Sequence, residues 1–415
     1  MIKSNPFFSS TFIKIWHRHF NTEKPLYSFD FIKNISFYKP RSFPLFINSG
    51  KNLTKGVSYS LDDESAATDF KSKCFLIYDV PKFFNVKTNS GNKNLKVKKA
   101  KQYPGFLIHL DKHKDFNTYF KSTFSKSSVQ KFRRYNRRLE HCFSITYKMY
   151  YGEIDKKEYD FVFSYFNKLL TKRFDDKQIT NNNLNPEEWN FYYDVVYPLI
   201  LEKKASLFVV YNDGIPITVR LNYFSEDIIF DAITVFDIDY SKFHIGKISI
   251  MKILEWAFDN DFKTFDFTKG YFDYKESWSD LKYDFEYHIY YDSKSVTAAL
   301  IANYLYLFFK LKQSLREKDI NTKLHKALFF LKNNKSSNAN SYHIKPIINS
   351  KDFEPEKTQE IDINSTENTF LRKIVFDYLY TSSENLKHIN LYKCKTASNS
   401  YILAGKKDSQ LITHS

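Results

Sequence analysis

The feature that most constrains the fold is a run of three short, strand-like segments joined by tight turns. Residues 207–235 divide into apolar segments at Asn-Asp-Gly (212–214) and at Ser-Glu-Asp (225–227), and the first of these breaks is typical of a hairpin turn. Within 217–223, apolar and polar residues alternate with the period of a strand. The pattern predicts a β-meander, followed by an apolar helix over 248–258 and a further strand over 262–267.

The chain is long enough to form two or three domains with a sizeable core. It has 415 residues, of which 42% are apolar and 19% aromatic. Such a content of aromatic residues argues against global disorder, because disordered chains contain few of them.

The scarcity of glycine and cysteine argues against several classes of function. Only 9 glycines occur, none in a G-x-G-x-x-G pattern, and the closest pair, Gly50 and Gly56, is followed by Val57 where a phosphate loop needs lysine. We therefore expect neither a Walker-type NTPase nor a standard dinucleotide site. The 3 cysteines lie far apart, which predicts a reducing compartment without disulfides or a cysteine-based zinc site. The histidines within 17–19 and 109–113 lack a third ligand nearby, so we expect no metal.

The positive charge is concentrated in one place only. Of the 63 basic residues behind the net charge of +16, 53 are scattered lysines, which are weak evidence for nucleic-acid binding. Four of the ten arginines lie together on a predicted helix over 130–140, on the side opposite its aromatic stripe. These four are Arg133, Arg134, Arg137 and Arg138. Stacked like charges favour an anionic partner, but a solvated basic face is an equally good interpretation.

The segment His244-Ile245-Gly246-Lys247 leads directly into the predicted apolar helix. A helix N-terminus offers unpaired N–H donors and partial positive charge, which suits a pyrophosphate such as that of coenzyme A. Gly246 permits close approach of the backbone, and Lys247 adds a full charge. A single glycine before a helix is also common without any ligand, so both interpretations stay open.

A second cluster follows the strand 262–267. Asp266 lies between two phenylalanines, and a buried carboxylate there needs partners. It could orient an amine or accept its proton, or it could cap the strand or pair with Lys275. Tyr274 could donate a proton to a leaving thiolate, or it could be one of many core aromatics in a chain with 31 tyrosines.

The order of these motifs resembles the GNAT-type N-acyltransferase domain of the CelD-like branch, which is related to the Fem-type peptidyltransferases. That family's pattern reads Tyr-Ser-x-x-Ser-Pro-Gly before the helix and Asp-Phe-x-x-Gly-x-x-x-Tyr-Lys-x-x-Trp after it. The first part corresponds to Tyr240 through Gly246, with His244-Ile245 where Ser-Pro is usual. The second part matches at Asp266, Phe267, Gly270, Tyr274, Lys275 and Trp278. The resemblance covers about residues 116–292.

The resemblance implies an α/β (α+β) fold: a GNAT-like mixed sheet with helices on both faces and two GNAT-like domains in tandem. An acyl-CoA donor would bind at His244, Ile245, Gly246 and Lys247, with no metal. The catalytic residues would be Asp266, Tyr274 and Asp231, the last on the preceding strand. The substrate-binding residues would be Arg134, Arg137, Arg220, Lys275 and Trp278.

The expected organisation has five parts. They are a degenerate GNAT-like domain (1–115), the acyltransferase domain (116–292), a helical extension (293–335), a polar linker (336–369) and a C-terminal segment of unknown fold (370–415). An apolar run over 296–309 is shorter than a membrane span. Together with the absence of an apolar signal core at the N-terminus, it predicts a cytoplasmic protein.

Two functions remain open at this point. The first is an N-acyltransferase acting on an amine such as an amino sugar or cell-envelope precursor, since relatives are often encoded with polysaccharide genes. The second is a catalytically silent module that binds an anionic polymer or RNA. Fem-type relatives use aminoacyl-tRNA as donor, and the clustered arginines would also fit that donor.

Overall fold

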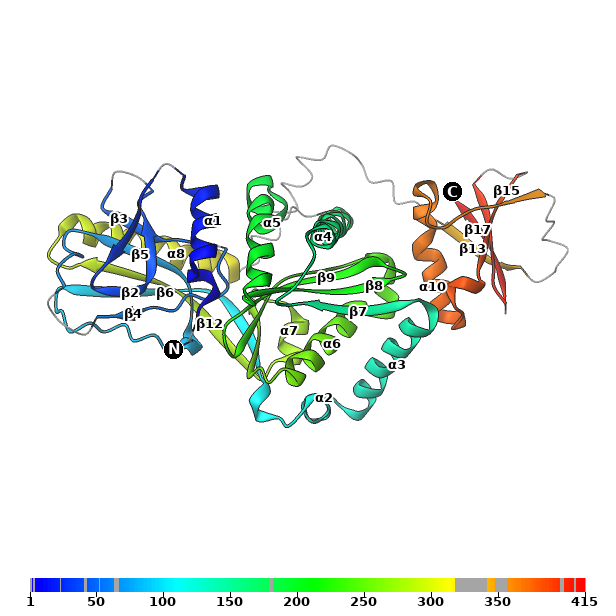
Figure 1. Ribbon diagram of the computed structural model, residues 1–415, viewed down its shortest axis with the longest axis horizontal. Coiled ribbons are helices and arrows are strands. Elements are labelled where there is room, and N and C mark those ends of the chain that lie inside the picture. Colours follow the sequence, from blue (N-terminus) through cyan, green and yellow to red (C-terminus); the bar gives the residue numbers. More distant parts are fainter. Residues whose placement is uncertain are drawn as a thin grey trace.

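The computed structural model describes the chain except at residues 1, 3, 23, 41–42, 52, 63–66, 179–181, 318–341, 348–356, 396–398, 407 and 415. Its described part contains a 12-stranded sheet and a separate five-stranded sheet. The large sheet has the strand order β1-β2-β3-β5-β12-β6-β11-β10-β9-β8-β7, with β4 paired to β2. Figure 1 shows its two halves side by side, with the small sheet at the opposite end from the N-terminal half.

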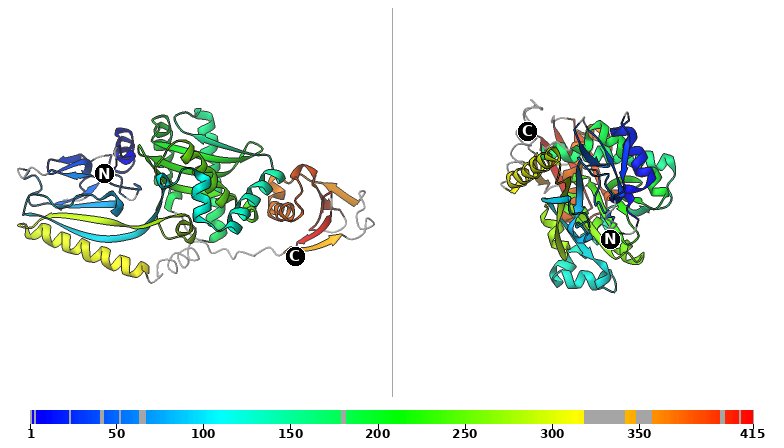
Figure 2. Two further views of the ribbon diagram at one scale, coloured as in Figure 1. Left: turned by 90° about the horizontal axis from the view of Figure 1, so that it is seen from below. Right: turned by 90° about the vertical axis from the view of Figure 1, so that its left-hand side faces the viewer.

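The N-terminal half of the large sheet holds the first six strands and two helices, of which the first joins the core of the second half through Phe12 and Trp16. Its elements are α1 (Ser10–Phe20), β1 (Leu26–Phe29), β2 (Ile32–Tyr38), β3 (Leu45–Asn48), β4 (Ser60–Leu61), β5 (Cys74–Pro81), β6 (Leu95–His109) and α8 (Val296–Glu317). The buried face of α8 packs on this half through Ala298, Ala302 and Phe309. In Figure 2, α8 runs along the outside of the N-terminal half.

The second half of the sheet contains the predicted meander and the motifs after it. Its elements are α2 (Phe116–Thr123), α3 (Lys126–Cys142), β7 (Ile145–Tyr150), α4 (Lys156–Lys177), α5 (Pro186–Leu201), β8 (Ala205–Asn212), β9 (Ile215–Phe224), β10 (Ile228–Phe236), α6 (Ile245–Asp259), β11 (Thr264–Lys269), α7 (Asp273–Trp278) and β12 (Leu281–Asp292). The meander is confirmed, because β8, β9 and β10 pair antiparallel in chain order.

Helices cover both faces of this half. Along β8, Leu207 and Val209 join the core beneath α4 and α5, while Phe208 and Val210 join the core that α3 and α6 cover. Alternate residues therefore face opposite helix layers, as the period of a strand requires. Figure 1 shows α4 and α5 on one side of the sheet and α3, α6 and α7 on the other. The predicted class, a mixed sheet with helices on both faces, is confirmed.

The two halves share strands. β6 and β12 pair antiparallel from Leu95↔Asp292 to Leu107↔Leu281, so the sheet continues across the boundary expected at residue 115. The same β6 also pairs with β11 through Gly105–His109. The lysine-rich start of β6 at residues 95–99 is a strand because it is hydrogen-bonded to β12.

The C-terminal region folds as a small sheet with one helix. Its elements are β13 (Tyr342–Ile347), β14 (Thr358–Glu360), α10 (Arg372–Ser382), β15 (Asn390–Cys394), β16 (Ser400–Ala404) and β17 (Ser409–His414). Two of these strands, β13 and β14, lie in the predicted polar linker 336–369, because they pair with β17 and β15 much later in the chain. The linker prediction differs from the structure there. Of the predicted helical extension 293–335, residues 318–335 lie outside the described part.

The small sheet is attached to the second half through α10. Phe376 contacts the rings of Phe143 and Tyr240, with centroids 4.9 and 4.7 Å apart. Arg372 pairs with Asp237 at 3.2 Å. Within the described ranges, none of the helices combines the length and hydropathy needed to cross a bilayer.

Candidate active site

The site is built where two neighbouring parallel strands lose their pairing. β10 and β11 run parallel and are in register over three residue pairs, ending at Phe230↔Asp266. Just beyond, Thr268 adopts the left-handed conformation with φ of 59°. A β-branched residue is strained there, and such strain is typically kept at functional sites. Beyond this point the two strands are no longer paired with each other.

The chain after β10 passes through a short 3₁₀ segment, η5 (Ile238–Phe243), into the N-terminus of α6. His244 precedes the helix with φ of 55°, and its side chain does not cap it. The N–H groups of Lys247 and Ile248 donate to the His244 carbonyl. Those of Ile245 and Gly246 have no acceptor in the described part of the chain. An uncapped helix end of this kind favours an anion.

Side chains of α3 lie against this helix end. The rings of Tyr135 and His244 have centroids 4.1 Å apart, and the Lys247 Nζ lies 5.3 Å from the Phe132 ring. Burial lowers the pKa of His244. Of the four predicted donor-binding residues, Lys247 is exposed, His244 and Gly246 are half-buried and Ile245 is part of the core. A Cβ on residue 246 would lie only 3.0 Å from the Phe236 ring, so glycine fits this turn closely.

A buried ion pair connects α6 with β10. Arg220 on β9, 1% exposed, places Nη2 2.7 Å from Asp231 Oδ2 and donates through Nη1 to Ser249 Oγ at 3.0 Å. Ser249 in turn donates to the Gly246 carbonyl at 2.9 Å. This chain of hydrogen bonds joins the helix end to Asp231. The Arg220 Nε has no partner in the described residues.

Asp266 has no exposed surface. The Tyr283 hydroxyl donates to the carboxylate, 2.7 Å from each oxygen, and the Thr268 N–H donates to Oδ1 at 2.8 Å. Burial raises the pKa of Asp266 to about 7. Thr268 also donates through Oγ1 to the Asp231 carbonyl at 3.2 Å. Thr268 thus links the Asp266 carboxylate to the backbone of Asp231, and the fully buried Asp266 carboxylate can act on a substrate only through its neighbours.

The three residues predicted on α7 take different positions. Lys275 is buried and donates to the Phe267 carbonyl at 2.7 Å, and burial lowers its pKa to about 8. It makes no ion pair with Asp266 in the described structure, although the charge of Asp266 acts on its pKa. Tyr274 is half-buried beside Asp231, and burial raises its pKa to about 12. Trp278 packs in the core against Phe120 and Phe132, where it cannot contact a substrate.

The arginines of α3 divide into two pairs. Arg133 donates to Asn117 at 3.0 Å, and Arg138 lies 4.8 Å from the Tyr380 ring. Arg134 and Arg137 are both exposed on the solvent side of the helix. Both are therefore free to meet an anion in solvent.

Three further residues of the site had no signal in the sequence. Tyr283 on β12 holds Asp266, and Ser249 connects Arg220 to Gly246. Arg173 on α4 lies 4.6 Å from the Phe236 ring, and its charge acts on the pKa of Tyr274. Each comes from an element that local patterns cannot connect to β11, because the contact is made only by the folded sheet.

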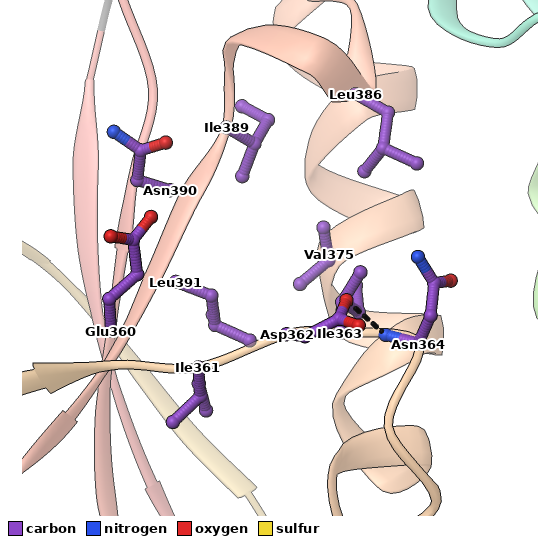
Figure 3. Close-up of a pocket in the computed structure, with 10 residues that line it drawn as sticks. All are labelled: Glu360, Ile361, Asp362, Ile363, Asn364, Val375, Leu386, Ile389, Asn390 and Leu391. Atoms are coloured by element: carbon purple, nitrogen blue, oxygen red, sulfur yellow. Dashed lines mark hydrogen bonds between the residues drawn. The ribbon is translucent and has the colours of Figure 1, made fainter.

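The described residues also contain a hollow of about 520 Å³ in the C-terminal region. Figure 3 shows it between β15, the segment after β14 and α10, with apolar side chains such as Leu391 and Val375 and the polar side chains of Glu360 and Asn390. None of the predicted site residues lines it. Among the residues with defined placement, no group of three or more His, Cys, Asp or Glu could hold a metal ion.

Comparisons with known proteins identify the domain that carries this geometry. Residues 126–276 match the family model described as an acetyltransferase (GNAT) domain. No curated protein sequence matches the chain. Among solved structures, L-PGS from Bacillus licheniformis is 12% identical with a TM-score of 0.40, covering 68% of this chain and 88% of that one. FemX is 11% identical with a TM-score of 0.42, covering 61% and 83%.

A third solved structure, a tandem GNAT protein from the clavulanic acid biosynthesis pathway, is 6% identical with a TM-score of 0.33, covering 61% of this chain and 77% of that one. The matched family segment runs from α3 to α7 and includes the α6 end, Asp231 and Asp266. Residues 126–276 therefore form a GNAT acetyltransferase domain.

Proposed function

We propose that the chain transfers an acyl group from a CoA-type thioester to an amine, with an amino sugar or another cell-envelope precursor as acceptor. The observation that carries this proposal is the uncapped N-terminus of α6, directly after the strand that bears Asp231, within a GNAT domain. The amides of Ile245 and Gly246 and the exposed ammonium of Lys247 suit the phosphate oxygens of such a donor.

The residues present fit a coenzyme A group. Two amide donors lack acceptors in the described structure, and α3 brings Arg134 and Arg137 to the same side of the domain through the Tyr135–His244 contact. When bound, the thioester supplies an activated acyl carbon and a thiolate leaving group. The protein's task is to hold this carbon and the amine in line, which lowers the barrier by several kcal/mol.

The chemistry assigns different roles to the three predicted catalytic residues. The amine nitrogen bonds to the acyl carbon, the carbon–sulfur bond breaks, and the nitrogen loses one proton while the thiolate gains one. Tyr274 is protonated at neutral pH, because burial raises its pKa to about 12, and it suits the proton donor to sulfur. Asp231, fixed by Arg220, orients the amine and accepts the proton that the nitrogen loses. Asp266 acts as a positioning residue through Thr268.

Calorimetric titration with acetyl-CoA and longer acyl-CoAs tests the donor. We expect saturable heat at one site, and at least a fivefold weaker affinity in Lys247→Met. In Tyr274→Phe we expect unchanged acyl-CoA affinity and a fall in turnover of 10²-fold or more, since general acid catalysis contributes about that much. Absence of heat with every acyl-CoA would contradict the proposal.

The exposed pair Arg134 and Arg137 favours one alternative. These arginines could hold an RNA or another anionic polymer, either in a catalytically silent module or as part of an aminoacyl-tRNA donor. Such binding weakens steeply with salt, since counterions are released. A gel-shift titration with tRNA at rising salt tests it. Tight, salt-dependent binding together with no acyl-CoA heat would favour the alternative, and the reverse pattern would favour the CoA thioester.

A further inference from the structure

Four lysines gather where the N-terminal half of the sheet meets the GNAT half. We call Lys51, Lys55, Lys269 and Lys312 the lysine cluster. Lys51 and Lys55 belong to the segment after β3, Lys269 ends β11, and Lys312 lies on α8. Their charges act on one another. Burial lowers the pKa of Lys55 most, and the charge of Lys269 lowers it further. Burial likewise lowers the pKa of Lys312, and the charges of Lys51 and Lys269 add to that effect. They are separated by up to 261 positions in the sequence.

One carboxylate organises the inner part of the cluster. Asp79 on β5 has no exposed surface and φ of 62°, and its Oδ1 lies 2.5 Å from Lys269 Nζ. Its Oδ2 accepts a hydrogen bond from Thr54 at 3.0 Å, and its carbonyl accepts one from the Val57 N–H at 2.8 Å. Asp79 therefore holds the segment 54–57, which contains Lys55, beside the end of β11.

Lys55 is the buried member of the cluster, and it lacks a carboxylate partner among the described residues. It is 9% exposed, yet it makes no hydrogen bond or ion pair with any residue whose placement is described. The charges of Asp79 and Glu188 act on the pKa of Lys55, but neither carboxylate forms an ion pair with it in the described structure. A buried ammonium without a partner destabilises the fold by several kcal/mol. A structure keeps such a group where a ligand supplies the missing charge.

The cluster also borders the acyl-transfer site. Gly56, next to Lys55, is packed so closely that a Cβ there would lie 3.3 Å from the Phe230 ring. Phe230 is the residue before Asp231, and its register partner is Asp266. At the other side, the charge of Lys275 acts on Lys55. The segment that carries the unpaired ammonium thus contacts β10 one residue before Asp231 and lies beside the end of β11.

We propose that the lysine cluster binds an oxyanion of the acyl acceptor, a phosphate or a carboxylate, between the two halves of the sheet. The inference rests on the proposed acyl transfer for the identity of the ligand as acceptor. The anion site itself rests only on the cluster. The donor would bind at the α6 end and the acceptor's anion at Lys55, so that the amine lies between them near Asp231.

Two lysine variants that should each weaken the binding of a different ligand test this arrangement. Inorganic pyrophosphate and citrate are titrated calorimetrically at low salt into the full chain and into Lys55→Met, Lys247→Met and Lys148→Met. Lys148 is an exposed control that pairs with Glu158 on the far edge of the sheet. We expect Lys55→Met to weaken anion binding at least tenfold and to leave acetyl-CoA affinity within twofold. We expect Lys247→Met to weaken acetyl-CoA binding at least fivefold, together with any second pyrophosphate site at the α6 end, and to leave the Lys55-dependent anion site within twofold. We expect Lys148→Met to change neither.

The two anions distinguish the sources of the oxyanion. Tighter binding of pyrophosphate indicates a phosphorylated acceptor, and tighter binding of citrate indicates a carboxylate. A chain that binds neither anion, or a Lys55→Met variant that binds them as tightly as the wild type, would overturn the proposal. Failure of acetyl-CoA to bind, with anion binding intact and lost in Lys55→Met, would overturn the proposed donor while the anion site stands.

A measurement on the unmodified chain covers the case in which Lys55→Met does not fold. Acetic anhydride labels accessible amines, and peptide mass spectrometry reports each lysine separately. We expect pyrophosphate or citrate to slow labelling of Lys55 at least fivefold and that of Lys148 by less than twofold. Equal rates at Lys55 with and without the anions would contradict the proposal.

Discussion

The two halves of the large sheet each contain one parallel strand pair, and the two pairs end very differently. β3 and β5 are in register over three residue pairs, as are β10 and β11. Between β10 and β11 the chain forms α6, whose uncapped amides follow the strand. Between β3 and β5, the described residues form a turn at Gly50 and the short strand β4, without an α-helix. One half therefore offers helix amides at its strand ends, and the other offers the ammonium groups of Lys51 and Lys55.

The buried charges follow the same division. In the GNAT half, Arg220 has a carboxylate and a hydroxyl partner, and Asp266 accepts from Tyr283 and Thr268. In the N-terminal half, Lys55 has no partner in the described structure. Arg220 and Asp266 thus hold the strands of the GNAT half in place through their partners, whereas Lys55 has the proposed role of binding a ligand.

The largest effect is expected where a buried pair is broken. Arg220→Met leaves Asp231 as a buried charge without its partner, which costs about 3–5 kcal/mol of unfolding free energy. Urea unfolding followed by tryptophan fluorescence measures it. The double variant Arg220→Met/Asp231→Leu removes both charges, and we expect it to recover most of the loss. A single variant as stable as the wild type would show that the pair does not hold β9 to β10.

Asp266 provides a pH-dependent test of the same half. Its pKa is raised by burial from 3.8 to about 7, so the folded chain keeps a proton that the unfolded chain releases. Stability is therefore highest below about pH 4 for this group and falls as the pH rises to 7, by about 4 kcal/mol at 1.36 kcal/mol per pKa unit.

Asp266→Asn is the matched control, because an amide mimics the protonated carboxyl. Its oxygen can accept from the Thr268 N–H, and its nitrogen can donate to the Tyr283 hydroxyl. We expect the free energy of unfolding of this variant to lose the slope between pH 4 and 7. Parallel curves for the two proteins would mean that Asp266 does not titrate in this range.

The pH dependence of stability linked to Lys55 is expected to have the opposite sign. Replacing Lys55 should also stabilise the fold, because it removes a buried charge without a partner. Burial, followed by the charge of Lys269, lowers its pKa to about 8 from 10.5, so the unfolded chain binds the proton more tightly. Stability linked to Lys55 thus rises between pH 8 and 10.5, by about 3 kcal/mol in total. At pH 7 we expect Lys55→Met to be more stable than the wild type, with a shallower rise above pH 8, in thermal unfolding across that range. A destabilised Lys55→Met at pH 7 would show that the ammonium has a partner in the fold.

The difference between these regions also explains what the sequence could predict. The meander and α6 follow from local signals: Asn212-Asp213-Gly214 sets a turn, and alternation along 217–223 sets a strand. Asp266, Tyr274 and Lys275 lie within ten residues of each other, so one motif contains them all. Their helix end at Gly246 is likewise next in the chain to the strand that places it.

Long-range partners could not be predicted in this way. Lys269 and Asp79 are 190 positions apart, and nothing local marks Lys55 among 53 lysines as the one that becomes buried. Tyr283 lies on a strand that reaches Asp266 only because β6 and β12 connect the two halves. The strands β13 and β14 were missed for a similar reason, since each owes its conformation to a partner near the C-terminus.

The smallest effect is expected on the solvent side of α3. Arg134 and Arg137 are exposed, so Arg134→Ala/Arg137→Ala should change the free energy of unfolding by no more than about 0.5 kcal/mol. If they meet the phosphates of the donor, the double variant weakens acyl-CoA binding a few-fold at low salt and this difference disappears near 0.5 M salt, because exposed charges are screened. Arg133→Ala/Arg138→Ala is the matched control, since those side chains already contact Asn117 and Tyr380. Equal affinities of the two double variants for acyl-CoA would show that the basic face of α3 is only solvated, and would leave the α6 end as the sole source of positive charge for the donor.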